Sequence, residues 1–242
     1  MKKTALVIPA RYESGRLPGK PLLPILGIPM IERTFARCIL GFPKEQVFVA
    51  TDDVRIEDFC RSKGMPVLMT SRDCLTGTDR VAEAAEKLGA DYVINVQGDE
   101  PILNPDDIKA IANAAEKFPD EVLNGYCAID TEADFRNSSL PKVTFAPDGR
   151  LLYMSRAAIP STKSLEFKAA WRQICIYGFS RAALQLFARQ DRKTPLEAIE
   201  DIEILRFLEL GINVRMIEVS NHSFPVDVPE DVTKIESIIA KQ

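Results

Sequence analysis

The chain has 242 residues and a formal net charge of -4, so it lacks the overall positive charge of a general nucleic-acid binder. Its hydrophobic share of 46% and charged share of 27% are ordinary for a globular protein, and a single core is the simpler expectation. The N-terminus lacks the apolar stretch of a signal peptide, and no apolar run reaches the ~18 residues that a membrane span requires. We therefore expect a cytoplasmic protein with neither a membrane nor a nucleic-acid partner.

The five cysteines are widely spaced and include no CxxC pair, which favours buried thiols over a disulfide framework or a zinc site. The single histidine, His222, lies near the C-terminus in a segment that we expect to be a loop. Hydrolases of the Ser-His-Asp or Cys-His type need a positioned imidazole, so that class is disfavoured.

The first distinctive segment follows a buried strand predicted for residues 5–8, which we expect Pro9 to end because proline has no N–H to donate. The loop after it carries Arg11, Arg16 and Lys20. Ligands of open α/β sheets bind at the carboxyl ends of the strands, so cations at this place favour a polyphosphate ligand. A basic loop that is merely solvated has the same composition, and neither a Walker motif nor GxGxxG occurs here.

Strands and helices then alternate. We predict helices at 30–40, 54–63, 81–88 and 104–117, and strands at 46–50, 66–70, 92–96 and 122–129. This alternation is typical of a doubly wound parallel sheet. We expect Asp53 to cap the helix that follows it, although it could instead lie beside a nucleotide, and Thr78 to cap the helix near residue 81.

A second cluster of polar residues, the sequence QGDEP from Gln97 to Pro101, directly follows the predicted strand 92–96. Mg²⁺ prefers one or two carboxylates together with phosphate oxygens and water. Asp99 and Glu100 would point to opposite faces if the strand continued, so only one of them is a candidate ligand. The sequence therefore predicts a magnesium site at the same edge of the sheet as the basic loop.

The pattern changes near residue 140. Two strand-like segments, 142–146 and 151–154, flank an Asp-Gly turn, which indicates a hairpin and a small antiparallel lobe. We predict one long helix from residue 194, because apolar residues recur every three positions from Ile199 to Leu208. A last strand at 214–219 and a helix ending near residue 240 complete the chain.

The motifs resemble those of the 3-deoxy-manno-octulosonate cytidylyltransferase (CMP-Kdo synthetase) family. The similar segments are ARYESGRLPGKPL from Ala10, TGTDR from Thr76, QGDEP, SRAAIP from Ser155 and PVDVPEDV from Pro225. The resemblance implies a Rossmann-like three-layer α/β/α sandwich with a mostly parallel sheet and a small β-rich insertion. It implies a single domain, 1–242, and a homodimer formed through the lobe around 140–180.

The implied reaction is the Mg²⁺-dependent transfer of CMP from CTP to a sugar acid, most simply Kdo, with release of pyrophosphate. The residues that carry over fall into four roles: catalysis by Arg11, Lys20 and Asp99; nucleotide binding by Pro9, Ala10, Arg11, Arg16, Lys20, Gly77, Arg80 and Gln97; sugar-acid binding by Arg156, Gln173, Tyr177 and Glu203; and metal binding by Asp99 and Asp227.

Two departures from the family pattern concern the acceptor: Gln173 replaces a histidine, and Ile204 replaces a glutamine. They leave open a related acid, such as 8-amino-8-deoxy-Kdo or a nonulosonic acid. A nucleotide with another base and a non-catalytic nucleotide-binding protein are further alternatives. Arg156 could also pair with a structural acid instead of a substrate carboxylate.

Overall fold

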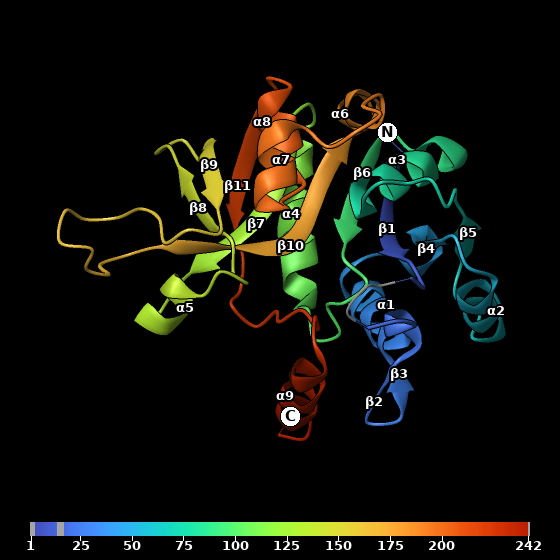
Figure 1. Ribbon diagram of the computed structural model, residues 1–242. Helices are drawn as coiled ribbons and strands as arrows, with labels where there is room; N and C mark the ends of the chain where they lie inside the picture. Colours follow the sequence, from blue (N-terminus) through green and yellow to red (C-terminus); the bar gives the residue numbers. More distant parts are fainter. Residues whose placement is uncertain (1–2, 14–16, 242) are drawn as a thin grey trace.

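The computed structural model describes residues 3–13 and 17–241, and a mixed sheet of nine strands forms the centre of that part of the chain (Figure 1). The strands are β1 (Thr4–Ala10), β4 (Val47–Thr51), β5 (Val67–Met69), β6 (Tyr92–Val96), β7 (Val122–Ala128), β8 (Lys142–Phe145), β9 (Leu151–Ser155), β10 (Trp171–Ser180) and β11 (Val214–Glu218). Their order is β11-β7-β10-β6-β1-β4-β5, with β8 paired to β10 and β9 paired to β8. Strands β10 and β6 are antiparallel, whereas β1 is parallel to both β4 and β6.

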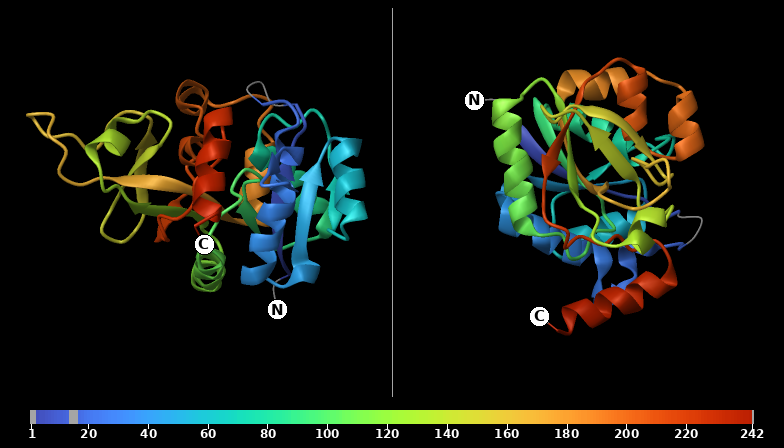
Figure 2. Two further views of the ribbon diagram at one scale, coloured as in Figure 1. Left: turned by 90° about the horizontal axis from the view of Figure 1, so that it is seen from below. Right: turned by 90° about the vertical axis from the view of Figure 1, so that its left-hand side faces the viewer.

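Helices cover both faces of the sheet. Helices α1 (Met30–Gly41), α2 (Val54–Ser62) and α4 (Pro105–Lys117) bury their apolar residues in one core, and α3 (Gly77–Leu88), α6 (Arg181–Ala188) and α8 (Ile204–Glu209) bury theirs in a second. The two sets of helices lie on opposite sides of the sheet (Figure 2), so the chain has a core on each side of it. The prediction of a three-layer α/β/α sandwich is therefore confirmed.

A crevice opens where the chain reverses direction across the sheet. From β1, the chain passes through α1 on one face of the sheet to reach β4. It later reaches β6 through α3 on the other face. Strands β4 and β6 lie on either side of β1, so their connections diverge at its carboxyl end. Such switch points are where open α/β sheets bind ligands.

The predicted hairpin forms from β8 and β9, whose register pairs Val143 with Met154. It extends the sheet beside β10, and the loop 161–170 projects beyond it (Figure 1). Two small elements complete this half: α5 (Glu132–Arg136) follows β7, and α7 (Pro195–Glu200) precedes α8. The dimer interface predicted for 140–180 remains a prediction.

Helix α9 (Pro229–Ile239) lies apart from the main layers, beside a hairpin of β2 (Pro24–Ile25) and β3 (Ile28–Pro29) (Figures 1 and 2). A small apolar cluster that includes Ile25, Val226 and Ile235 joins them. The sequence patterns did not indicate β2, β3 or α6. The segment after residue 226 is thereby attached to the loop after β1.

Two predicted boundaries are wrong. Pro9 does not end β1, because the ladder to β6 already stops at Val7 and Pro9 pairs only with β4, opposite Ala50. Helix α3 starts at Gly77, and its cap is Thr76 rather than Thr78, since the Thr76 hydroxyl accepts a hydrogen bond from Asp79 N. The prediction for Asp53 is confirmed, because its carboxylate accepts from Arg55 N at 2.9 Å.

The long helix predicted from residue 194 is two short helices, α7 and α8. Asp201 has a left-handed backbone conformation (φ 51°), which ends α7 and turns the chain before α8. Ile199 is consequently 79% exposed, although the apolar pattern placed it in the same stripe as the buried Ile202 and Leu205. The break brings Glu203 to the crevice.

Candidate active site

A cleft of about 300 Å³ occupies the crevice at the carboxyl ends of β1 and β6. Segments that are distant in the sequence form its walls: the loop after β1, the turn after β6, the start of α3, the α7–α8 junction and the segment before α9. The predicted residues that line it are Pro9, Ala10, Arg11, Lys20, Gly77, Arg80, Gln97, Asp99, Glu203 and Asp227. Arg16 lies outside the described residues.

Lys20 lies between the two predicted metal ligands. Its Nζ is 2.6 Å from Asp99 Oδ2 and 3.3 Å from Asp227 Oδ1, and its side chain is only 15% exposed. Burial alone would lower the pKa of this ammonium, but attraction and hydrogen bonding from both carboxylates outweigh burial and raise the pKa above 10.5. Lys20 therefore carries its positive charge throughout the neutral pH range.

The turn after β6 is held tightly against β1. A Cβ on Gly98 would lie 2.7 Å from the carbonyl oxygen of Pro9, which is too close for any side chain. Asp99 O accepts a hydrogen bond from Val226 N at 3.0 Å, so the segment that carries Asp227 is fixed directly to the turn that carries Asp99. Backbone contacts thus bring together two carboxylates that are far apart in the sequence.

The other acids near these ligands have structural partners. Glu100 is 1% exposed and accepts a hydrogen bond from Ser223 Oγ, and burial together with the charge of Asp99 raises its pKa to about 8. Asp231 accepts from the backbone N–H groups of Asp227 and Val228 at 2.8 and 3.0 Å. Of the adjacent pair, Asp99 lines the cleft and Glu100 is buried away from it.

Glu203 occupies the N-terminus of α3. Its carboxylate accepts from Gly77 N at 3.2 Å and from Thr78 N at 2.9 Å, where the free N–H groups of a helix favour an anion. Arg80, on the first turn of the same helix, is paired with Asp52 at 2.9 Å and is 4% exposed at its side chain. Its charge is therefore largely neutralised within the wall of the cleft.

Three predicted acceptor residues do not line the cleft. The Arg156 guanidinium donates to the carbonyl oxygens of Ser138, Glu200 and Asp201, at 3.0, 2.5 and 3.0 Å, and so binds the end of α7. Gln173 and Tyr177 lie on β10 and are both buried, at 8% exposed.

The Gln173 amide contacts both Tyr177 on its own strand and Asn124 on the neighbouring strand β7. It donates to Asn124 Oδ1 at 3.0 Å and to the Tyr177 hydroxyl at 3.3 Å. These contacts lie on the sheet rather than at its edge, so their connection to an acceptor remains a prediction.

Two charged residues of the cleft escaped the sequence analysis. Lys193 and Asp201 line the cleft and form an ion pair at 2.6 Å. Neither belongs to a recognisable motif, and Asp201 reaches the cleft only because of the helix break, so no sequence signal could have identified them.

The donor set suits a magnesium ion. The described residues contain no group of three or more His, Cys, Asp or Glu side chains arranged to hold a metal. Asp99 and Asp227 nevertheless converge on one cation, the Lys20 ammonium. Two carboxylates with room for phosphate oxygens and water match the coordination that Mg²⁺ prefers, so the residues fit the predicted metal.

An α/β/α sheet with cations and paired carboxylates at its switch point is the framework of a nucleotidyltransferase, and comparisons with known proteins assign the chain to that class. The profile of the cytidylyltransferase family matches residues 5–216. Escherichia coli 3-deoxy-manno-octulosonate cytidylyltransferase is 36% identical over 242 residues, which cover 100% of this chain and 98% of that protein.

Another relative, the 8-amino-3,8-dideoxy-manno-octulosonate cytidylyltransferase of Shewanella oneidensis, is 38% identical over 97% of this chain and 98% of that protein. A solved structure of CMP:2-keto-3-deoxy-manno-octonic acid synthetase complexed with CTP superposes with a TM-score of 0.91 at 36% identity, covering 99% of each chain. The chain belongs to the 3-deoxy-manno-octulosonate cytidylyltransferase (CMP-Kdo synthetase) family.

Proposed function

We propose that this enzyme transfers CMP from CTP to the anomeric hydroxyl of Kdo and releases CMP-Kdo and pyrophosphate. The observation that carries the proposal is the group of Lys20, Asp99 and Asp227 in the cleft between β1 and β6. It combines a charge for phosphates with two ligands for a metal. Relatives that span the whole chain bear the names of this activity.

The proposed roles follow from the positions of the residues. Arg11 and Lys20 bind the triphosphate from the loop after β1, while Gln97 and the start of α3 form the wall for the cytidine. A magnesium ion held by Asp99 and Asp227 would neutralise charge that develops at the α-phosphate. No side chain need act as a nucleophile, because such transfer depends on positioning and electrostatic stabilisation.

The 8-amino derivative of Kdo is the second candidate acceptor. Relatives named for that acid are 38% identical to this chain, and relatives named for Kdo are 36–38% identical. Gln173, which donates to the Tyr177 hydroxyl at 3.3 Å, stands where the family pattern has a histidine, whereas Tyr177 matches that pattern. The acceptor is therefore the part of the proposal that requires direct measurement.

We also propose that the enzyme is a cytoplasmic homodimer formed through the lobe around 140–180. Leu152 and Leu165 of this lobe are 53% and 65% exposed, and such side chains are suited to an interface. No helix in residues 3–13 and 17–241 has the length and apolar character to cross a membrane. Light scattering during gel filtration would report the mass, and a monomer at micromolar concentration would contradict the dimer.

The reaction is tested by pyrophosphate release with Kdo and Mg²⁺, with CTP and UTP supplied in parallel. We expect release with CTP and loss of turnover after chelation of divalent metal. Faster release with UTP would contradict the base assignment. Absence of release with either nucleotide, while CTP still binds in calorimetry, would instead indicate a non-catalytic nucleotide-binding protein.

A further inference from the structure

One ammonium group, Lys20 Nζ, occupies the position between the two proposed metal ligands. It lies 2.6 Å from Asp99 Oδ2 and 3.3 Å from Asp227 Oδ1. Magnesium binds carboxylate oxygens at roughly 2.0–2.1 Å, so an ion shared by these two oxygens would overlap the space that the ammonium fills. The ammonium and the metal therefore compete for the same two carboxylates.

The side chain can leave this position without movement of the backbone. Lys20 begins a short 3-10 helix, η1 (Lys20–Leu22), whose backbone is fixed by hydrogen bonds from Leu22 N to Gly19 O at 2.9 Å and from Leu23 N to Lys20 O at 3.1 Å. A lysine ammonium is a compact charge on a flexible four-carbon stem. Rotation about side-chain bonds would move it from the carboxylates to phosphate oxygens in the same cleft.

We propose that Lys20 bridges Asp99 and Asp227 in the nucleotide-free enzyme and that the triphosphate draws it away, which opens the site to the metal. This inference rests on the proposed function, because it takes the ligand to be a nucleoside triphosphate. Its consequence is coupling: the metal binds weakly until the nucleotide engages Lys20. By reciprocity, the metal strengthens nucleotide binding by the same factor.

The coupling predicts that loss of Lys20 increases the affinity for the metal. Replacing Lys20 with methionine keeps the apolar stem but removes the charge, so the metal alone should bind the variant better than the wild type. A lysine that served only to hold phosphates would leave metal binding unchanged. A lysine that stabilised the arrangement of the acids would, when lost, make metal binding weaker.

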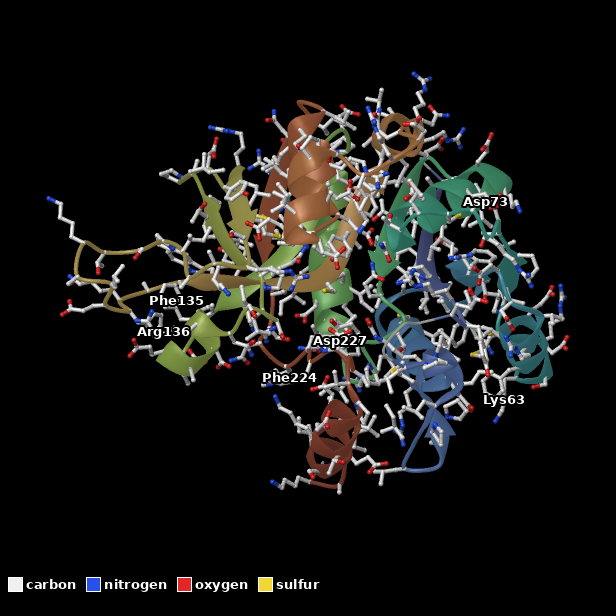
Figure 3. The ribbon with its side chains drawn as sticks, in the orientation of Figure 1. Lys63, Asp73, Phe135, Arg136, Phe224 and Asp227 are labelled. Atoms are coloured by element: carbon white, nitrogen blue, oxygen red, sulfur yellow. The ribbon has the colours of Figure 1, made fainter. Side chains whose placement is uncertain are left out.

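The probe is Mn²⁺ alone, with free ion measured by electron paramagnetic resonance in the absence of nucleotide. We expect K20M to lower the dissociation constant for Mn²⁺ about tenfold, within the usual range of coupling between ligands. K63M is the control for net charge. Lys63 lies at the end of α2, pairs with Glu32 and is well away from Asp227 (Figure 3). K63M should bind Mn²⁺ as the wild type does, and adding D99N to K20M should abolish the gain.

Equal or weaker Mn²⁺ binding by folded K20M would overturn the inference, as would a gain of the same size in K63M. K20Q provides a second neutral variant should K20M fold poorly, and the same result is expected of it. Turnover with CTP is measured separately, on the wild type. A gain in Mn²⁺ affinity in K20M, together with a wild type that shows no turnover, would support the exchange and contradict the proposed function. Turnover by the wild type without a gain in K20M would contradict the exchange alone.

Discussion

Removal of the buried Arg206 guanidinium should destabilise the protein severely. Arg206 and Glu197 both have fully buried side chains and form a bidentate pair, with Nε and Nη2 each 2.6 Å from a carboxylate oxygen. Nη1 also donates to Asp79 Oδ1 at 3.0 Å, and the guanidinium lies 3.7 Å from the centre of the Phe187 ring. The pair thus joins α7 and α8 to the first turn of α3.

In R206M, the Glu197 carboxylate would remain buried and would keep the hydrogen bond from Thr194 N at 3.1 Å, but it would lose both bonds from the guanidinium. Breaking such a pair from one side costs about 3–5 kcal/mol. That is a large share of the ~5–15 kcal/mol by which most domains are stable. We therefore expect a large fall in the urea midpoint, with little change in the slope of the transition.

The double variant E197L/R206M separates the uncompensated charge from the loss of packing. Replacing both partners with apolar side chains removes the stranded carboxylate, so we expect it to recover most of the stability that R206M loses. A loss below about 1 kcal/mol in R206M would refute the reasoning about burial. A double variant less stable than R206M would show that the ion pair itself, rather than the stranded charge, sets the cost.

Three further predictions concern the cleft and its supports. D99N should reduce turnover by about 10²-fold or more. E100Q should remain within a few-fold of wild type, because burial raises the pKa of Glu100 to about 8 and glutamine mimics its protonated form at pH 7. Steady-state kinetics of both variants would test this contrast. G98A should cost about 1–3 kcal/mol in urea unfolding, since its Cβ would lie 2.7 Å from Pro9 O, and an unchanged midpoint would contradict the crowding. Burial would raise the pKa of Glu200, but hydrogen bonds from the end of β9 lower it overall from 4.5, so its stabilisation is present above that pH and is lost as pH falls through the lowered value. E200Q should therefore be less stable than wild type by about 1–2 kcal/mol at pH 7, and a difference that did not shrink as the pH falls below 4.5 would contradict this origin.

The parts of the fold that could be predicted from sequence are those with strong local signals. Apolar runs bounded by polar turns identified the strands at 92–96 and 122–129 to within a residue at each end, and the Asp-Gly turn identified the β8–β9 hairpin. The single long helix failed because a three-residue apolar spacing does not reveal a left-handed residue such as Asp201. Strand β10, antiparallel within a mostly parallel sheet, depends on pairing between distant segments.

The candidate site divides in the same way. Lys20 and Asp99 follow predictable strands, so the topology alone brings them to one edge of the sheet. That Lys20 contacts both acids could not be predicted, because it depends on the hydrogen bond between Val226 and Asp99. The position of Arg156 depends on packing between β9 and α7, and that of Gln173 on contact between β10 and β7, which no motif encodes.

The most direct test of the account is identification of the product. The enzyme would be incubated with CTP, Mg²⁺ and an equimolar mixture of Kdo, 8-amino-8-deoxy-Kdo, Kdn and N-acetylneuraminate, and the CMP conjugates would be identified by mass spectrometry. The account predicts CMP-Kdo, formed in step with pyrophosphate. A conjugate of the 8-amino acid alone would retain the chemistry and change the acceptor, whereas the absence of any CMP-ulosonic acid would contradict the proposed function.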